Sequence, residues 1–374
     1  MREDIQMRNA VDVITTYNGE VPLQIHLKNY CRENKNIGSK DRKILSELVF
    51  GYFRMKGNND SLDIAALLVN AAQNSVMLTD FVSHWKNNRE IGDIDIKTEM
   101  KTYFPLFSKV SESIETSSFL NYLQQKPKIF IRCNADTQQE VVEELMAAGY
   151  EFTIKENCIA FEKNYPLDTL QSFEEGLFEI QDIASQHISE IFQPIKNEAW
   201  WDCCAGSGGK SLLLLELMPQ IQLFVSDSRE SIIQNLKDRF ERHDHTNYTS
   251  YILDLERVTE KELIKIPQFN AIIADVPCSG SGTWGRTPEW LSFFTEEKLN
   301  EYVLKQRNII STVTNKLLPG GKIIYITCSV YSDENEKNVN WFCENLPLKL
   351  EQQKYFQFSN DGGDTLFGAV MKRV

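Results

Sequence analysis

Two cysteines of this 374-residue chain follow short apolar runs that are typical of buried strands. Cys278 lies three residues after the run Asn270–Asp275, and Cys328 directly follows the run Ile323–Thr327. Both runs are bounded by turn residues, which predicts strands of a parallel sheet. Ligands of open α/β sheets bind at the carboxyl ends of such strands. We therefore expect both thiols at the ligand-binding edge of one sheet.

A glycine-rich turn follows an earlier predicted strand, Ala199–Asp202. It does not fit the nucleoside-triphosphate loop, because Cys204 stands where that loop needs a glycine, and Ser211 replaces the last glycine of the dinucleotide fingerprint. The turn is still suited to close approach of a ligand to the backbone at a helix N-terminus. The residues that we expect to bind a cofactor here are Cys204, Ala205, Gly206, Ser207, Gly208, Gly209 and Lys210.

Three carboxylates follow the next predicted strands of the same sheet, at Asp227, Asp254 and Asp275. Asp227 follows the turn by about 20 residues, the spacing at which an acid holds ribose hydroxyls. Asp254 and Asp275 are expected to hold an adenine amino group and a cationic end of the ligand. A sulfonium-bearing nucleoside without phosphates suits such an edge, so the pattern predicts S-adenosylmethionine.

Thiols beside a methyl donor suggest a specific chemistry. C5 of a pyrimidine is not nucleophilic, but a thiolate that adds to C6 makes C5 enamine-like and able to take a methyl group. A base then removes the C5 proton, and elimination frees the enzyme. One thiol is the minimum and a second can assist release, but the residues alone do not distinguish the roles of Cys278 and Cys328. The alternative is a pair of buried, inert cysteines.

The elements around these residues predict three domains. Residues 1–125 show apolar positions at helical spacing and are expected to form an all-α bundle, with a loop at Trp85–Asp95. Residues 126–192 read β-α-β-β-α-β, the order of a ferredoxin-like α+β domain. Residues 193–374 repeat strand, turn and helix, which predicts a doubly wound α/β domain of the class I methyltransferase type.

Composition limits the class of protein. The net charge of −13 argues mildly against a nucleic-acid binder, yet residues 129–198 alone carry 14 Asp and Glu against 4 Lys and Arg. Any phosphate-binding face is therefore expected outside that segment. The eight cysteines show no zinc spacing, so we expect free thiols and no metal. No apolar run is long enough for a membrane span, and we expect a cytoplasmic, monomeric protein.

Three segments resemble the signature motifs of RNA cytosine-5 methyltransferases: Asp202–Ser211, Asp275–Gly282 and Tyr325–Ser329. Nearly the whole chain is similar to the RsmB (Sun/Fmu) branch of that family, which methylates small-subunit ribosomal RNA. The resemblance implies that Cys328 is the nucleophile and that Cys278 assists breakdown of the adduct. It leaves open a transfer-RNA substrate, or an RNA-binding assembly factor with a vestigial transferase fold.

The segment Ser39–Arg54 resembles the helical RNA-binding domain of NusB, which implies an RNA-binding N-terminal domain. The basic residues that become candidate RNA contacts are Lys40, Arg42, Lys43, Arg54 and, after the Cys278 motif, Arg286. Trp284 and Trp290 are expected either to contact RNA or to pack a loop. The chain departs from the family pattern at Ser207, Ile232 and Gly285, where a proline and two arginines are usual.

Overall fold

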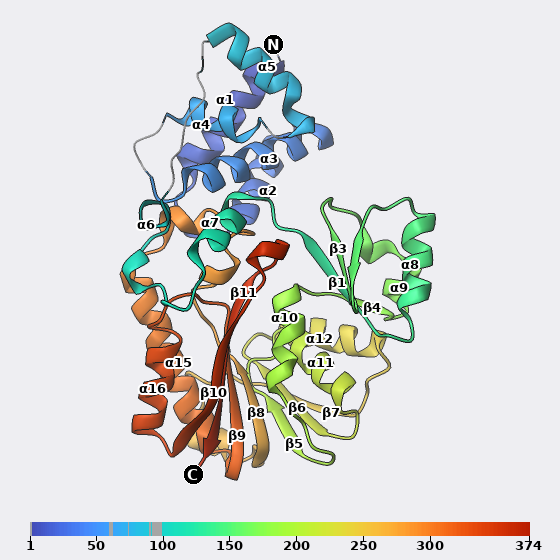
Figure 1. The fold of residues 1–374 in the computed structure, drawn as a ribbon, viewed down its shortest axis with the longest axis vertical. Coiled ribbons are helices and arrows are strands. Elements are labelled where there is room, and N and C mark those ends of the chain that lie inside the picture. The colour runs from blue at the N-terminus through green and yellow to red at the C-terminus, as the bar shows by residue number, and fades with distance from the viewer. Residues whose placement is uncertain (1, 60–62, 74, 90, 92–98) are drawn as a thin grey trace. The chain divides into compact units, whose positions relative to one another are not determined.

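A computed structural model describes residues 2–59, 63–73, 75–89, 91 and 99–374 (Figure 1). The chain divides into two compact units. The first comprises residues 1–110, 115–126 and 283–296, and the second comprises residues 111–114, 127–282 and 297–374. The short segment 283–296 thus belongs with the N-terminal residues, although it follows the Cys278 motif in sequence. The three predicted domain boundaries stay a prediction.

The first unit is helical where it is described, as expected. Its α-helices are α1 (Arg2–Thr16), α2 (Leu23–Glu33), α3 (Ser39–Lys56), α4 (Ile64–Ala71), α5 (Thr79–Arg89), α6 (Met100–Tyr103), α7 (Thr116–Gln124) and α14 (Trp290–Phe293). The apolar faces of α1, α3 and α4 form its core, where Val13, Leu48 and Leu68 are almost fully buried. The expected loop at 85–95 is wrong for its first part, because α5 continues to Arg89; residues 90 and 92–95 lie outside the described residues.

A smaller sheet opens the second unit. Its elements are β1 (Ile129–Cys133), α8 (Gln138–Ala147), β2 (Thr153–Lys155), β3 (Cys158–Phe161), α9 (Gln171–Glu174) and β4 (Phe178–Ile180). Within the described chain this sheet has four strands in the order β2-β3-β1-β4, all paired antiparallel. The order of strands and helices agrees with the β-α-β-β-α-β pattern read from the sequence. Helix α10 (Ile183–His187) then begins at Asp182, whose carboxylate accepts from the Ala184 N–H.

The larger sheet has seven strands among the described residues, in the order β10-β11-β9-β8-β5-β6-β7. The strands are β5 (Ala199–Asp202), β6 (Gln222–Asp227), β7 (Tyr248–Ile252), β8 (Phe269–Asp275), β9 (Leu317–Thr327), β10 (Leu348–Gln357) and β11 (Thr365–Arg373). Strands β7, β6, β5, β8 and β9 run parallel, and β11 pairs antiparallel with β9. The five parallel strands were predicted; the antiparallel pair β10 and β11 was not.

Helices cover both faces of this sheet (Figure 1). They are α11 (Gly209–Leu217), α12 (Glu230–Arg242), α13 (Glu260–Leu263), α15 (Glu296–Thr314) and α16 (Glu336–Asn345). Alternate strand residues point to opposite faces, so Trp200 packs with the leucines of α11 while Trp201 faces the other layer. The parallel strands are therefore apolar on both faces, and their carboxyl ends share one edge. None of the described helices is long and apolar enough to cross a membrane.

Candidate active site

The two predicted thiols are in contact. Cys278 lies beyond the end of β8 and Cys328 directly follows β9, and these strands are parallel neighbours. The two Sγ atoms are 3.3 Å apart, and the Cys328 backbone N–H also points to the Cys278 Sγ atom at 3.3 Å. The hydrogen bond from Cys328 and burial raise the pKa of Cys278 well above its ordinary value. The contact therefore favours a protonated Cys278 beside Cys328.

One buried carboxylate ties the two thiol loops together. Glu334 accepts hydrogen bonds from the Ser279 N–H at 2.8 Å and the Ser279 hydroxyl at 2.5 Å. It also accepts from the Ser329 hydroxyl at 2.5 Å and from the Gln306 amide at 2.9 Å. Ser279 follows Cys278 and Ser329 follows Cys328, so each cysteine precedes a residue held by Glu334. Burial raises the pKa of Glu334, while the serine hydrogen bonds oppose this effect.

The backbones of the loops after β8 and β9 also pack closely against each other. The Gly282 N–H donates to the Cys328 carbonyl at 2.9 Å. A Cβ atom at Gly282 would lie 2.1 Å from the Thr365 carbonyl oxygen, so a larger residue would displace the loop. Ser281 also accepts from the Val330 N–H at 2.9 Å. The loops after β8 and β9 are thus joined at several points beyond their sulfur atoms.

The glycine turn leaves room for a ligand against its backbone. Gly206 has a φ of 53°, and no heavy atom lies within 4 Å of the position that a Cβ would occupy. Gly208, with a φ of 87°, precedes α11, and a Cβ there would collide with Phe240. The two glycines are therefore explained differently. At Gly206 the missing side chain leaves open space beside the backbone, and at Gly208 it lets the backbone pack closely against α12. The turn fits a ligand that lies along the backbone at the start of α11.

The carboxylate of Asp227 is held at the end of β6. It accepts from the Gly206 N–H at 3.2 Å and pairs with the Arg229 guanidinium, whose Nε is 2.9 Å from Oδ1. Burial would raise the pKa of Asp227, but the Arg229 hydrogen bonds lower it below its ordinary value. Arg229 was not singled out in the sequence. It supplies a guanidinium to this acid although Ile232 stands near the position where the family usually has its arginine.

The other two acids differ in their surroundings. Asp275 forms an ion pair with Lys210, with 2.6 Å between Nζ and Oδ2, so the turn and the end of β8 are directly linked. Burial opposes protonation of Lys210, but the charge of Asp275 outweighs it and raises the lysine pKa. Asp254 follows β7, is half-exposed and accepts from the Glu256 N–H at 3.0 Å. Asp227 and Asp275 therefore contact the turn, while no such contact is found for Asp254 within the described residues.

The candidate RNA-binding residues lie in the first unit. Lys40, Arg42 and Lys43 are exposed on the first turns of α3, and the Arg42 Nε donates to the Ile37 carbonyl. Arg54 is directed inward instead: it donates to the Gly285 carbonyl at 3.0 Å, and desolvation lowers its pKa. The expected contact of Arg54 with phosphate stays a prediction, while in this structure its guanidinium binds a protein carbonyl.

The segment 283–296 was expected to contact RNA or to pack. Trp284 is buried between Phe104 and Phe294, with ring centroids 5.2 and 5.1 Å away, which favours packing. Gly285 has no room for the arginine that is usual in the family, because a Cβ there would lie 2.6 Å from the Tyr122 ring. Arg286 is half-buried, and its N–H donates to the Thr283 carbonyl. Its contact with RNA stays a prediction.

Comparison with known proteins identifies the domain that carries this site. Residues 189–364 match the family model described as 16S rRNA methyltransferase RsmB/F. This region is similar to the RsmB/F methyltransferase domain. The matched residues include the glycine turn, both thiols and the three acids. The family uses S-adenosylmethionine, which confirms the cofactor predicted from the turn and the acids.

Curated relatives agree with this assignment. The chain is 27% identical over 235 residues to ribosomal RNA small subunit methyltransferase B of Salmonella arizonae, covering 60% of this chain and 52% of that protein. It is 25% identical over 280 residues to the Klebsiella pneumoniae protein of the same name, covering 74% of this chain and 62% of that protein. The chain therefore spans about half to three fifths of these relatives.

Solved structures share the fold. A protein named PH0851 superposes with a TM-score of 0.75 at 23% identity, covering 98% of both chains. NSun6 from Pyrococcus horikoshii, solved with SFG, has a TM-score of 0.61 at 16% identity and covers 70% of this chain and 94% of that one. Both likenesses concern the fold. The full-length match to PH0851 includes the helical N-terminal region as well as the RsmB/F-like domain.

The sequence did not single out Glu334. It lies in the polar run Ser332–Lys337, which reads as a solvated loop. Its burial depends on donors that converge from two strand ends and from α15, and no local pattern reveals that convergence. Its position six residues after Cys328 was the one feature of the sequence that could have pointed to a role near the thiols.

Proposed function

We propose that this protein transfers a methyl group to C5 of a cytidine in small-subunit ribosomal RNA, through a covalent bond between Cys328 and C6. The contact between the two thiols carries the proposal, because one target base could then meet both sulfur atoms. S-adenosylmethionine would supply an electrophilic methyl group. The turn 204–210, with Asp227 and Asp275, would hold it, since the space at Gly206 is open, Asp227 accepts from the Gly206 N–H, and Asp275 pairs with Lys210.

The two cysteines have different roles in the remaining steps of the reaction. The Cys328 thiolate adds to C6, which places a pair of electrons on C5 for the bond to the methyl carbon. A base then takes the C5 proton, the electrons of the C5–H bond re-form the C5–C6 double bond, and Cys328 leaves C6 as a thiolate. Cys278 assists this second stage from 3.3 Å away, because its raised pKa favours the thiol, which can donate a hydrogen bond to the departing Cys328 sulfur. The base has to leave its stack to reach the thiols.

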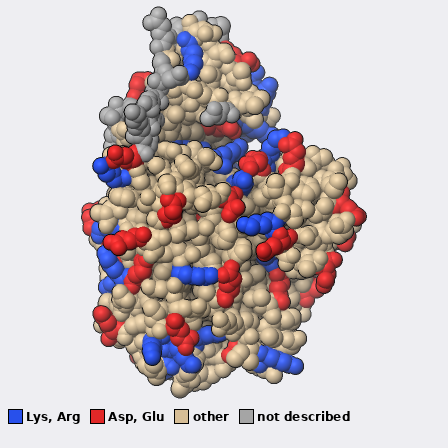
Figure 2. Space-filling model, viewed as in Figure 1, with Lys and Arg blue, Asp and Glu red and all other residues tan. Residues whose placement is uncertain are grey.

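RNA recognition is assigned to the first unit in this proposal. The exposed cations Lys40, Arg42 and Lys43 at the start of α3 would form part of a NusB-like surface and would contact phosphates of the RNA. Figure 2 shows Lys and Arg interspersed with Asp and Glu on the face in view, so affinity would come from local groups of cations and not from a broad basic surface. The antiparallel sheet β2-β3-β1-β4 is assigned to the ferredoxin-like class by its strand order.

Two cysteine variants test the proposed function. Small-subunit ribosomal RNA from cells that lack the protein is incubated with labelled S-adenosylmethionine and mapped by bisulfite sequencing. Cys328→Ala should abolish transfer, and Cys278→Ala should accumulate a protein–RNA adduct that survives a denaturing gel. Cys343→Ala, at a half-buried cysteine on α16, is the matched control and should keep full activity. Full transfer by Cys328→Ala would overturn the proposal, as would transfer to transfer RNA alone.

A further inference from the structure

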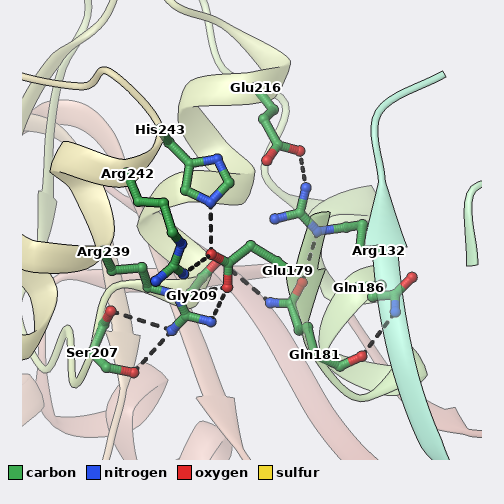
Figure 3. A network of polar contacts seen from close by, with 10 residues as sticks. All are labelled: Arg132, Glu179, Gln181, Gln186, Ser207, Gly209, Glu216, Arg239, Arg242 and His243. Carbon is green, nitrogen blue, oxygen red and sulfur yellow. Dashed lines mark hydrogen bonds and ion pairs between the residues drawn. The ribbon is translucent and has the colours of Figure 1, made fainter. Parts of the chain in front are cut away.

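A buried charge cluster joins the smaller sheet to helix α12 (Figure 3). Glu179 of β4 is only 2% exposed and contacts two arginines and one histidine. Arg239 Nε lies 2.7 Å from Oε2, while Arg242 Nη2 and His243 Nε2 lie 2.7 and 2.6 Å from Oε1. Burial alone would raise the pKa of Glu179, but these hydrogen bonds and charges lower it to about 2. The carboxylate is therefore ionised at neutral pH.

The same arginine reaches the glycine turn. Arg239 Nη1 donates to the Ser207 hydroxyl at 2.9 Å and to the Ser207 carbonyl at 3.3 Å. Its other nitrogens face Glu179, so one guanidinium is shared between the smaller sheet and the turn (Figure 3). Ser207 stands where the family usually has proline, and a proline offers no hydroxyl to this arginine.

A residue just after β4 lies against the same turn. Gln181 directly follows the last residue of β4 and is two positions after Glu179. Its Nε2 approaches the Gly209 carbonyl at 3.4 Å, and its Oε1 accepts from Arg132 Nε at 2.8 Å. Arg132 in turn pairs with Glu216 of α11, the helix that follows the turn. The turn is thus contacted at Ser207 by Arg239 of α12 and at Gly209 by Gln181.

The backbones are also packed closely here. Gly176, just before β4, has a φ of 69°, and a Cβ at this position would lie 2.3 Å from the Arg242 carbonyl oxygen. The Arg242 guanidinium lies 4.1 Å from the centre of the Phe173 ring. The junction between the smaller sheet and α12 therefore has little freedom to shift without breaking the contacts of Glu179.

We infer that Glu179 and Arg239 are positioning residues for the S-adenosylmethionine site, and that the smaller sheet acts through them to hold the turn at Ser207 in its ligand-ready conformation. Arg239 is a rigid, forked donor, and Glu179 fixes its orientation from within the protein. Without this support the turn would have to be ordered when the ligand binds, at a cost in affinity. The inference rests on the proposed function only in requiring that the turn binds S-adenosylmethionine.

Calorimetry with S-adenosylmethionine tests the inference without RNA. Ser207→Ala removes the hydroxyl but no charge, and it should weaken binding roughly tenfold. Ser207→Thr keeps the hydroxyl and should restore most of the affinity. Arg239→Lys should weaken binding at least as much, because an ammonium cannot bridge Ser207 and Glu179. Glu241→Gln, at an exposed acid of α12, is the matched control and should leave the dissociation constant unchanged.

A double-mutant cycle separates positioning from general stability. If Arg239 transmits the effect, Ser207→Ala should cost less affinity in the Glu179→Gln background than in the wild type. The thermal unfolding of ligand-free Ser207→Ala should match that of the wild type. Wild-type affinity in both Ser207→Ala and Arg239→Lys would overturn the inference, even if Glu179→Gln fails to fold. A wild-type protein that does not bind S-adenosylmethionine would instead overturn the proposed function.

Discussion

The Sγ atoms of Cys278 and Cys328 are 3.3 Å apart, although 50 residues separate them in the chain. Their strands explain the contact, because β8 and β9 pair in parallel with Asp275 opposite Ile326. Each thiol follows its strand on the same edge of the sheet. Glu334 then joins the two loops through Ser279 and Ser329, so the sulfur atoms are held in place by hydrogen bonds from both sides.

The first prediction concerns the ionisation of Cys278. The largest cause of its raised pKa is the hydrogen bond with Cys328, followed by burial. Cys328→Ala removes that partner, so the Cys278 pKa should fall and its thiolate should appear at lower pH. The rate of iodoacetamide labelling at Cys278, followed by mass spectrometry across pH, should show its midpoint shifted downward in the variant.

Labelling of Cys343 in the same samples gives the control for that shift. Burial also raises the pKa of Cys343, but no Cys328 contact contributes. Its midpoint should therefore be the same in wild type and variant. An unchanged midpoint at Cys278 would mean that the thiol contact does not govern its protonation.

The second prediction concerns Glu334. Glu334→Ala leaves the donors of Ser279, Ser329 and Gln306 buried without their acceptor, and should lower the free energy of unfolding by about 3 kcal/mol. Glu334→Gln keeps the shape and part of the bonding. It should cost less stability but lower kcat for methyl transfer by about tenfold or more, because both thiol loops lose their common anchor.

The measurement for Glu334→Gln compares kcat with the KM for S-adenosylmethionine. The KM for S-adenosylmethionine should stay near the wild-type value, since Glu334 contacts the thiol loops and not the turn at 204–210. Glu336→Gln, two residues later at the start of α16, is the comparison, because the Glu336 carboxylate accepts from Ser111 and Tyr355 instead. An equal loss of kcat in both variants would indicate that the effect is general destabilisation of the protein.

Local patterns were sufficient to predict the parallel strands and the sheet edge that carries both thiols. The strand at Ala199–Asp202 has the predicted bounds, because it is an apolar run followed by a glycine-rich turn. Strand β10 was missed because it lies at the edge of the sheet and its middle, from Glu351 to Lys354, is polar and exposed. Its strand character comes from pairing with β11, which a local pattern does not record.

Site residues that depend on contacts between distant segments were harder to predict. Asp227 was chosen by its spacing from the turn and Asp275 by its place after a predicted strand, and both contact the turn. Arg54 looked like a phosphate contact because charge was the only information available, whereas its partner is a carbonyl 231 residues away. The Glu179–Arg239 pair spans 60 residues and joins β4 to helix α12, so neither residue has a local signature.

The third prediction concerns Gly206. Alanine at a φ of 53° is strained by about 1–2 kcal/mol, and its Cβ would enter the open space above the turn. Gly206→Ala should therefore lose both stability and at least tenfold in affinity for S-adenosylmethionine. Gly320→Ala is the matched control, because Gly320 has a φ of 74° and equally open surroundings on β9. Gly320→Ala should lose similar stability but no affinity for S-adenosylmethionine. An equal loss of affinity in both variants would refute the placement of the ligand at Gly206.

The fourth prediction concerns the cations at the start of α3. If Lys40 and Lys43 contact phosphates, the double change to alanine should weaken RNA binding for all sequences and should reduce the slope of log K against log salt by about 1 to 2. Filter binding of a ribosomal RNA fragment between low and moderate salt measures the slope. Lys28→Ala, at an exposed lysine of α2, is the control. An unchanged slope in the double variant would place the RNA-binding surface elsewhere, while a drop in methylation without a change in slope would point to a role in stability.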